Sequence, residues 1–366
     1  MEQPITFANM NSIYCIGASS MLALAHHYPN KQFYVVDTVD QVAPWNQPVP
    51  PFWEPQLPDL LLAHRNVKLH FHNNIQQFIR QCPLIFIAIE MRTKKKGRIE
   101  LNKWMEAVRL IRDNAAVSKY IIDKSDVPFD VRNTIMDVIQ PTQVVHSNYT
   151  NPEFFSHGSA FDTLLNPRRV VFGHRTPYAN LTLLHHIYNF VPKNNRLVIN
   201  DARSVDFTKI YCNALLGFMG TLANIGSTFA DDLNIDINQV FRIVDSEDRL
   251  GHGFLEPNVA VGGPALQRDI AYMAYMAEEG GHKEIAALFK GFIEVNKKRK
   301  EKFEKKMLKC MHSLRGKTIV ILGLAYKEGT EDMSDSPSIY ICEQLMRNKD
   351  VTLRVHDSIV YDEIIK

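Results

Sequence analysis

The chain has 366 residues, of which 45% are hydrophobic and 22% are charged, so it is long enough for roughly two or three domains and too apolar to be disordered. A formal net charge of +2 provides no electrostatic footprint for nucleic acid. No apolar run reaches the length of about 18 residues that a membrane span requires, and no signal peptide is evident at the N-terminus.

The cysteines are odd in number and widely spaced, which argues against a disulfide framework. They are Cys15, Cys82, Cys212, Cys310 and Cys342. Most of them lie in apolar segments, which is typical of buried thiols in the cytoplasm or another reducing compartment. No spacing of cysteine and histidine fits zinc, so we expect no metal site.

The N-terminal part alternates strand and helix signals. Residues 12–18, SIYCIGA, predict a strand ending at Gly17; SSMLALAHHYP predicts a helix, and QFYVVD predicts a strand ending at Asp37. Further apolar runs predict strands at 67–71, 84–89, 119–123, 142–147, 168–173 and 196–200. This alternation predicts an α/β fold with a Rossmann-like, doubly wound sheet over residues 1–200.

Strand signals disappear after Asp201. Apolar residues recur at helical spacing over 203–232, which predicts one long, largely buried helix in a helical central domain at 201–312. A strand at 318–323, a helix at 336–347 and a strand at 351–355 then predict a second βαβ unit. Because eleven residues follow it, we expect a partial C-terminal α/β domain at 313–366.

Several motifs along the chain resemble those of the UDP-glucose/GDP-mannose dehydrogenase family, and its UDP-glucose dehydrogenase members most closely. They are VVDTVDQVAPWNQPVPPFWEPQL, KSDVPF, SNYTNPEFFSHGSA, FTKIYCNALL, DRLGHGFLEPNVAVGGPALQRD and ILGLAYKEGTEDMSDSPS. The resemblance implies a dinucleotide-binding domain, a central domain that dimerises through its long helix, and part of a UDP-binding domain. It also implies oxidation of a primary alcohol on a sugar nucleotide in two steps, each using NAD.

That chemistry requires a cysteine thiolate, which traps the aldehyde and later leaves from a thioester. The resemblance places the family's cysteine at Ala265, whose methyl group cannot attack a carbonyl carbon. Cys212 is a weak substitute, because it adjoins Asn213 on the long helix and adjacent helical residues point to different faces.

Other site residues of the family are retained. Lys209 and Asn213 match the pair that contacts the sugar and the reacting oxygen, and they share one helical face. Asp269 matches the acid that organises water, and Glu153 matches the acid of N-P-E-F. The residues matched to substrate binding are Arg249 and Lys327. Structural roles stay open, such as a Lys209–Asp269 ion pair and a helix cap at Glu153.

The dinucleotide fingerprint G-x-G-x-x-G is degraded. Gly17 is kept, but Ser19 replaces the glycine that admits the pyrophosphate, and Leu22 replaces the glycine at the close helix–strand contact. Asp37 keeps the spacing of a ribose-binding acid, although it fits a polar strand end equally well. Further positions that depart from the family pattern are Glu90 to Thr93, Asp126, His157, Glu256 and Ser334.

Loss at the nucleophile, the cofactor turn, the phosphate contacts and the C-terminal domain predicts a catalytically inactive homologue with a structural or regulatory role. We expect no cofactor in that case, and a homo- or hetero-oligomer, or a larger protein assembly, formed through the helix at 203–232. The alternative is an active or partial NAD-dependent UDP-sugar dehydrogenase that oxidises the C6 alcohol of UDP-glucose. An unrelated small-molecule sensor is a third hypothesis.

Overall fold

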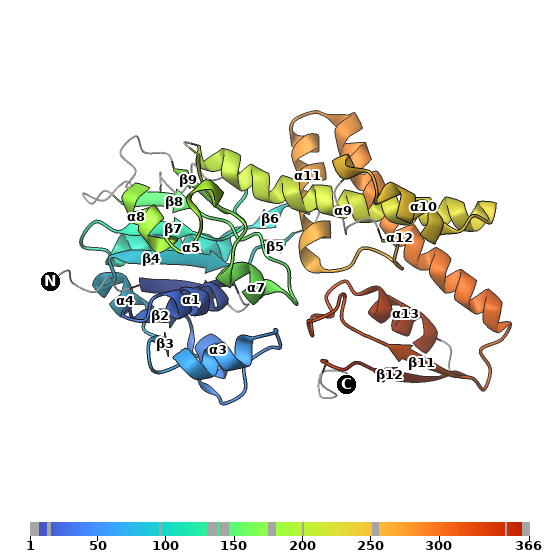
Figure 1. The fold of residues 1–366 in the computed structure, drawn as a ribbon, viewed down its shortest axis with the longest axis horizontal. Coiled ribbons are helices and arrows are strands. Elements are labelled where there is room, and N and C mark those ends of the chain that lie inside the picture. The colour runs from blue at the N-terminus through green and yellow to red at the C-terminus, as the bar shows by residue number, and fades with distance from the viewer. Residues whose placement is uncertain are drawn as a thin grey trace. The chain divides into compact units, whose positions relative to one another are not determined.

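The chain divides into two compact units, residues Met1–Arg92 with Ile99–Lys209, and Thr93–Arg98 with Ile210–Lys366. The structure is a computed structural model, shown in Figure 1. It describes residues 7–12, 16–94, 97–129, 138, 146–174, 181–199, 201–250, 256–347 and 350–360. The predicted division into three domains stays a prediction.

An eight-stranded sheet forms the centre of the first unit, with strand order β10-β9-β8-β7-β4-β1-β2-β3 (Figure 1). Neighbouring strands are parallel except β8 and β9, which pair antiparallel. The strands are β1 (Phe7–Ser12), β2 (Phe33–Val36), β3 (Leu69–His72), β4 (Leu84–Ile89), β7 (Tyr120–Asp123), β8 (Ser147–Thr150), β9 (Val170–His174) and β10 (Arg196–Ile199). This order confirms the predicted doubly wound sheet, with β1 between β2 and β4 at the point where ligands of such sheets bind.

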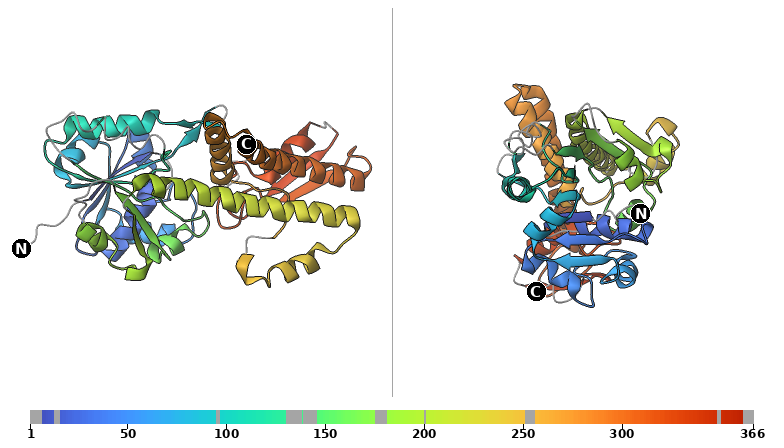
Figure 2. Two further views of the ribbon diagram at one scale, coloured as in Figure 1. Left: turned by 90° about the horizontal axis from the view of Figure 1, so that it is seen from above. Right: turned by 90° about the vertical axis from the view of Figure 1, so that its left-hand side faces the viewer.

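Helices cover both faces of this sheet, which explains why all six residues of β4 are buried. Figure 2 shows α5 on one face and α1 on the other. The core on the α1 side is built from Met21 and Leu22 of α1, Leu61 of α3, Phe161 of α7 and Leu184 of α8. The helices of this unit are α1 (Ile16–His27), α2 (Val39–Val42), α3 (Leu57–His64), α4 (Ile75–Gln81), α5 (Asn102–Asn114), α7 (Ala160–Leu165) and α8 (Leu181–Ile187), with 3-10 turns η1 (Pro44–Asn46) and η3 (Lys193–Asn195).

The strand predicted at 12–18 is wrong. Strand β1 ends at Ser12 and helix α1 begins at Ile16, so Gly17 lies in the first turn of the helix. A short apolar run does not distinguish a strand from a buried helix, since both bury every residue. The strand predicted at 142–147 is displaced as well: β8 begins at Ser147, and residues 142–145 lie outside the described part of the chain.

Helix α9 (Ala202–Leu233) confirms the long helix predicted at 203–232. In the second unit it packs on α11 (Pro264–Glu279) and α12 (Lys283–Met311) around Ala214, Ile270 and Phe289. The approach is close at Gly217, where an added Cβ would lie 2.7 Å from Cδ1 of Ile270. The second unit also contains α10 (Ile237–Val244) and the 3-10 turn η4 (Asp248–Leu250). The short strands β5 (Arg92–Thr93) and β6 (Ile99–Glu100) pair with each other where the chain passes between the two units.

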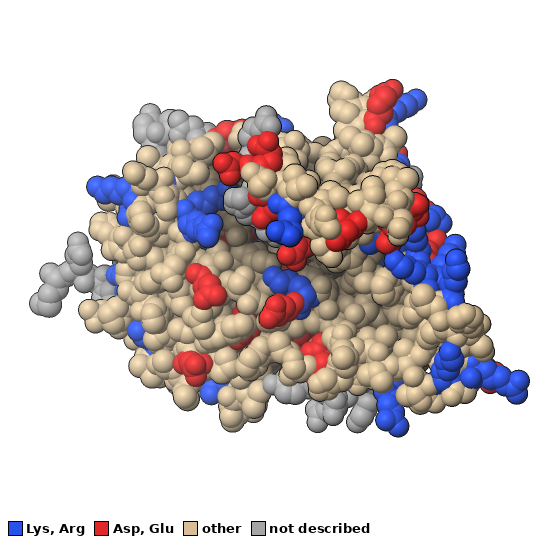
Figure 3. Space-filling model, turned by 45° about the vertical axis from the view of Figure 1, so that its right-hand side comes forward, with Lys and Arg blue, Asp and Glu red and all other residues tan. Residues whose placement is uncertain are grey.

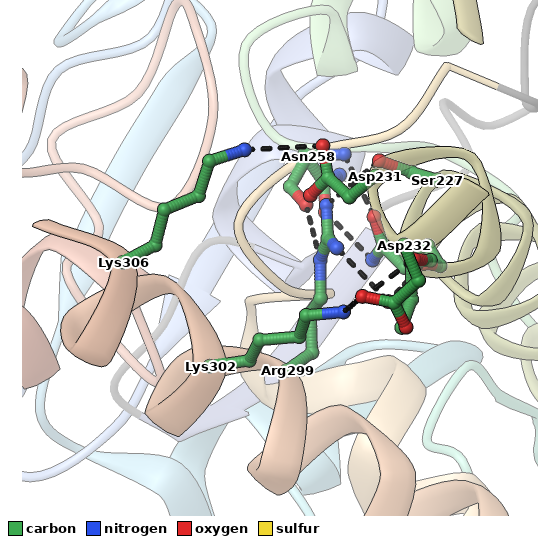
Figure 4. A network of polar contacts seen from close by, with 9 residues as sticks. Ser227, Asp231, Asp232, Asn258, Arg299, Lys302 and Lys306 are labelled. Atoms are coloured by element: carbon green, nitrogen blue, oxygen red, sulfur yellow. Dashed lines mark hydrogen bonds and ion pairs between the residues drawn. The ribbon is translucent and has the colours of Figure 1, made fainter. Parts of the chain in front are cut away.

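Polar contacts join the second half of α9 to α12 (Figure 4). The Arg299 guanidinium donates hydrogen bonds to the hydroxyls of Ser227 and Thr228, each at 3.0 Å. The ion pairs that extend this contact are Lys302–Asp232 at 2.8 Å and Lys306–Asp231 at 3.0 Å. Residues 297–317 hold ten Lys and Arg but two Glu, and Figure 3 shows Lys and Arg side chains gathered on the right of the visible face. The ion pairs on α12 are typical of a solvated helix face.

A second βαβ unit follows, as predicted, with β11 (Thr318–Leu322), α13 (Pro337–Met346) and β12 (Thr352–His356). The strands are parallel. Asp357, directly after β12, accepts backbone hydrogen bonds from Leu324, Ala325, Ile359 and Val360 at 2.7 to 3.2 Å. Burial alone would raise the pKa of Asp357, but these four donors outweigh it and lower the pKa to about 2.

Replacing this carboxylate tests the connection between the two strand ends. We expect Asp357→Asn to lower the free energy of unfolding of the second unit by about 1–3 kcal/mol, because it weakens several charge-assisted hydrogen bonds. The contribution of Asp357 is present above about pH 4 and is lost as the pH falls toward 2. Amide hydrogen exchange at Leu324 and Ala325 during urea unfolding measures this loss of stability. The exposed Glu343→Gln serves as the control. Equal protection of these amides from exchange in both variants would contradict the role given to Asp357.

Candidate functional site

Side chains occupy the positions of the predicted dinucleotide fingerprint at the start of α1. Gly17 is buried, Ser19 is 2% exposed and Leu22 is fully buried in the core between α1 and the sheet. The fingerprint glycines leave space for the pyrophosphate and for close contact of helix and strand. Here a hydroxymethyl and an isobutyl group occupy those positions, and the core is packed around the latter.

A buried polar network lies beside this turn. The hydroxyl of Ser20 donates to Oε1 of Glu153 at 2.8 Å, and Nζ of Lys124 forms an ion pair with the same oxygen at 2.5 Å. The Lys124 ammonium also donates to Oδ1 of Asn151 at 2.7 Å and lies 3.0 Å from the Tyr188 hydroxyl. The network therefore ties α1 to the segments that follow β7 and β8.

The charge on Lys124 is stabilised despite its burial. Its side chain is 1% exposed, and burial opposes the charged form. The Glu153 carboxylate and the Tyr188 hydroxyl outweigh that effect and hold the pKa of Lys124 above its usual value. Glu153 is thus engaged as the counterion of a buried lysine.

Asp37 lies at the end of β2, where a ribose-binding acid belongs. It is 7% exposed, and its Oδ1 accepts a hydrogen bond from the Thr38 amide at 2.7 Å. Its position suits the ribose of a dinucleotide, whereas Ser19 and Leu22 do not suit the pyrophosphate and the helix–strand contact beside it. The residues at the turn, taken together, do not fit NAD.

In the second unit, α9 and α11 bring two of the predicted residues together. Nδ2 of Asn213 donates to Oδ2 of the fully buried Asp269 at 2.7 Å. The Arg268 guanidinium donates to both oxygens of the same carboxylate, at 2.7 and 3.2 Å. Ala265 is in the first turn of α11, four residues before Asp269 and on the same helical face. Cys212 precedes Asn213 and points about 100° away around α9.

Lys209 lies on the α9 face that carries Asn213, as predicted. It is 8% exposed, and its Nζ lies 5.4 Å from the centre of the Phe154 ring. The Arg169 guanidinium lies 4.4 Å from the same ring. In the first unit, therefore, Lys209 sits beside the residue that follows Glu153, on an aromatic ring shared with a second cation.

The segment that leads to Ala265 is held by side-chain amides. Asn296 of α12 accepts from the Val261 amide at 2.8 Å and donates to the Val261 carbonyl at 2.9 Å. Asn224 of α9 likewise accepts from the Asn258 amide at 2.8 Å. Gly263 has φ 85°, and a Cβ there would lie 2.7 Å from the Tyr326 ring. The backbone around Ala265 is fixed although its side chain is inert.

The remaining predicted positions can be placed on the fold as follows. Lys327 is half-buried between β11 and α13, whereas Arg249 is in η4 and its side chain lies outside the described part of the structure. The positions that depart from the family pattern are Glu90, Asp126, His157 and Ser334, in loops, with Glu256 exposed. Sequence reasoning missed the roles of Ser20, Lys124 and Tyr188; only the KSDVPF motif marked one of them.

Comparisons with known proteins agree along the chain. Residues 14–191, 203–298 and 320–366 match the NAD binding, central and UDP binding domains of the UDP-glucose/GDP-mannose dehydrogenase family. UDP-glucose 6-dehydrogenase of Drosophila melanogaster is 31% identical over 372 residues, covering 96% of this chain and 78% of the relative. UDP-glucose 6-dehydrogenase 2 of Arabidopsis thaliana is 29% identical over 374 residues, covering 98% and 78%.

The fold matches solved structures of similar proteins. A UDP-glucose dehydrogenase from the archaeon Pyrobaculum islandicum superposes with a TM-score of 0.88 at 22% identity, covering 99% of this chain and 83% of that one. Among the described residues, no helix is long and apolar enough to cross a membrane, and no group of three or more His, Cys, Asp or Glu side chains is arranged to hold a metal ion.

The buried ion pair predicts a large effect of one substitution. We expect Lys124→Met to lower the free energy of unfolding by about 3–5 kcal/mol, since it leaves Glu153 charged and partly buried without its counterion. Urea unfolding of the whole chain measures this change. The exposed Lys298 pairs with Glu301 at 3.0 Å, and Lys298→Met is expected to have no measurable effect. Similar stability of the two variants would show that the pair does not hold this region together.

Proposed function

Because the chain belongs to the UDP-glucose/GDP-mannose dehydrogenase family, we propose that it is a catalytically inactive homologue, kept as a structural or regulatory subunit of an oligomer. The observation that carries this proposal is the packing at α1, where Ser19 and Leu22 fill the places of two fingerprint glycines and are almost completely buried. Buried side chains cannot withdraw to admit a pyrophosphate without disturbing the core.

The nucleophile position supports the same proposal. A covalent route through the aldehyde needs a thiolate, and Ala265 offers a methyl group. Asp269, the acid matched to water activation, is already bonded to Arg268 and Asn213. Glu153 likewise serves Lys124 and Ser20. The retained acids therefore have structural partners, which explains their presence without turnover.

Loss of chemistry has a direct test. We expect no NADH from the purified chain with NAD and UDP-glucose, and none from Ala265→Cys, because a restored thiol still lacks a bound cofactor. NADH absorbance measures turnover, and a UDP-glucose 6-dehydrogenase relative serves as the positive control. NADH production by Ala265→Cys alone would mean that the turn is competent, and production by the unaltered chain would overturn the proposal.

The alternative is an active NAD-dependent UDP-sugar dehydrogenase, which the names of the relatives favour. Its support in the chain is the retained set Lys209, Asn213 and Asp269, with Asp37 at the ribose position. When bound, NAD would supply the hydride acceptor. The alternative requires another nucleophile, and it predicts measurable turnover in the assay above.

The outer face of α9 supports the proposed oligomer. Leu215, Leu222, Phe229 and Leu233 recur at intervals of seven and four residues and are 41%, 53%, 61% and 67% exposed. The opposite face of α9 carries Asn213 and Ser227, which contact α11 and α12. Exposed apolar residues in a row more than four turns long are typical of a helix–helix contact surface.

Charged residues on this row should prevent self-association. We expect the unaltered chain to have about twice the 42.0 kDa of one copy, and Leu222→Asp with Phe229→Asp to reduce it to one. Light scattering coupled to size exclusion measures both. Leu62, which is 78% exposed in the first unit, provides the control Leu62→Asp. A monomer at micromolar concentration before any substitution would refute self-association and leave only a partner of different sequence.

A further inference from the structure

His64 is a buried histidine at the end of α3, next to α1. It is 8% exposed, and neither ring nitrogen has a hydrogen-bond partner within the described chain. The backbone of Ala63 favours the protonated ring, but this effect is smaller than that of burial. The same helix places Leu57, Leu60 and Leu61 in the core that α1 shares. A change at His64 therefore acts on the packing of α3 against α1.

Two basic side chains of the described residues face His64. The exposed His26 ring of α1 lies 5.7 Å from the His64 ring, centre to centre. The ammonium of Lys68, in the turn before β3, repels a proton on the His64 imidazole. Burial first, and then these two neighbours, lower the pKa of His64 below its usual value. Protonation would place a cation in the core near the Lys68 ammonium.

His146 repeats this arrangement at another place, directly before β8. It is 3% exposed; its Nδ1 accepts a hydrogen bond from the Lys119 amide at 3.2 Å, and its Nε2 is buried without a hydrogen-bond partner among the described residues. The facing charge is the buried ammonium of Lys119, which donates to the Arg80 carbonyl at 3.0 Å. Burial, followed by Lys119, lowers the pKa of His146. A proton on Nδ1 would also remove the acceptor that the Lys119 amide uses.

We propose that the first unit contains an acid switch: it stays folded only while the buried imidazoles of His64 and His146 are neutral, and mild acidification opens it. The two sites lie on different elements, α3 and the start of β8, so protons at both add to the same unfolding equilibrium. This property is independent of whether the chain turns over a substrate.

The direction in which stability changes with pH follows from how readily the folded and the unfolded chain bind protons. Above about pH 6.5 the imidazoles are neutral whether the chain is folded or unfolded, and they do not affect stability. As the pH falls below 6.5, the unfolded chain takes up protons that the folded unit resists, so stability falls until the folded pKa is reached. Each such proton changes the ratio of folded to unfolded chain by up to tenfold per pH unit.

Tryptophan fluorescence isolates the first unit, because Trp45, Trp53 and Trp104 are the three tryptophans of the chain and all lie in it. Urea unfolding of the full chain should show the two histidines changing the folded-to-unfolded ratio by up to about a hundredfold per pH unit below about pH 6.5. His64→Gln and His146→Asn should each reduce that dependence by up to tenfold per pH unit. His312→Asn, at an exposed position in the second unit, should leave it unchanged.

A second measurement covers variants that fold poorly. In the unaltered protein labelled with carbon-13 at histidine, the ring signals of His64 and His146 should stay those of the neutral imidazole at about pH 6.5 and change at lower pH only as the first unit unfolds. The proposal is overturned if both signals titrate at or above that value, or if both folded variants keep the pH dependence of the unaltered chain.

Discussion

The structure of the first unit depends on one buried charge, the ammonium of Lys124. A cation that is 1% exposed must be paired and fully hydrogen-bonded, and Glu153, Asn151 and Tyr188 meet that requirement. Glu153 is shared with Ser20 in the first turns of α1, so the pair also fixes the helix that opens the dinucleotide-type turn. The carboxylate that the family resemblance assigns to chemistry is thereby committed to holding three segments together.

In the second unit, too, buried polar contacts hold the backbone around a predicted site residue. Asn296 and Asn224 hold the segment before Ala265, and Asp269 is fixed by Arg268 and Asn213. These contacts keep a backbone in place around a residue that cannot react. An active enzyme needs a reactive side chain that such contacts hold in position. The proposed role as a subunit explains why these contacts are present although Ala265 cannot act as a nucleophile.

The sequence predicted the large features well because they rest on long periodic signals. Helix α9 repeats its apolar positions over eight turns, and β4 is apolar at every residue. The first strand was misplaced because SIYCIGA is short, apolar and compatible with either state. The bond between Ser20 and Glu153 joins residues 133 apart in sequence, and no local pattern encodes such a contact. The retained acids were recognised, but only the fold reveals the partners that occupy them.

We propose that Ser19 and Leu22 at the start of α1 prevent NAD from binding. Titration calorimetry with NAD alone tests this most directly. Our account predicts no heat of binding from the unaltered chain at any cofactor concentration at which a relative is saturated. We also expect no heat of NAD binding from Ser19→Gly, because Leu22 would still occupy the helix–strand contact. Saturable binding of NAD to the unaltered chain would contradict the account, whatever its rate of turnover.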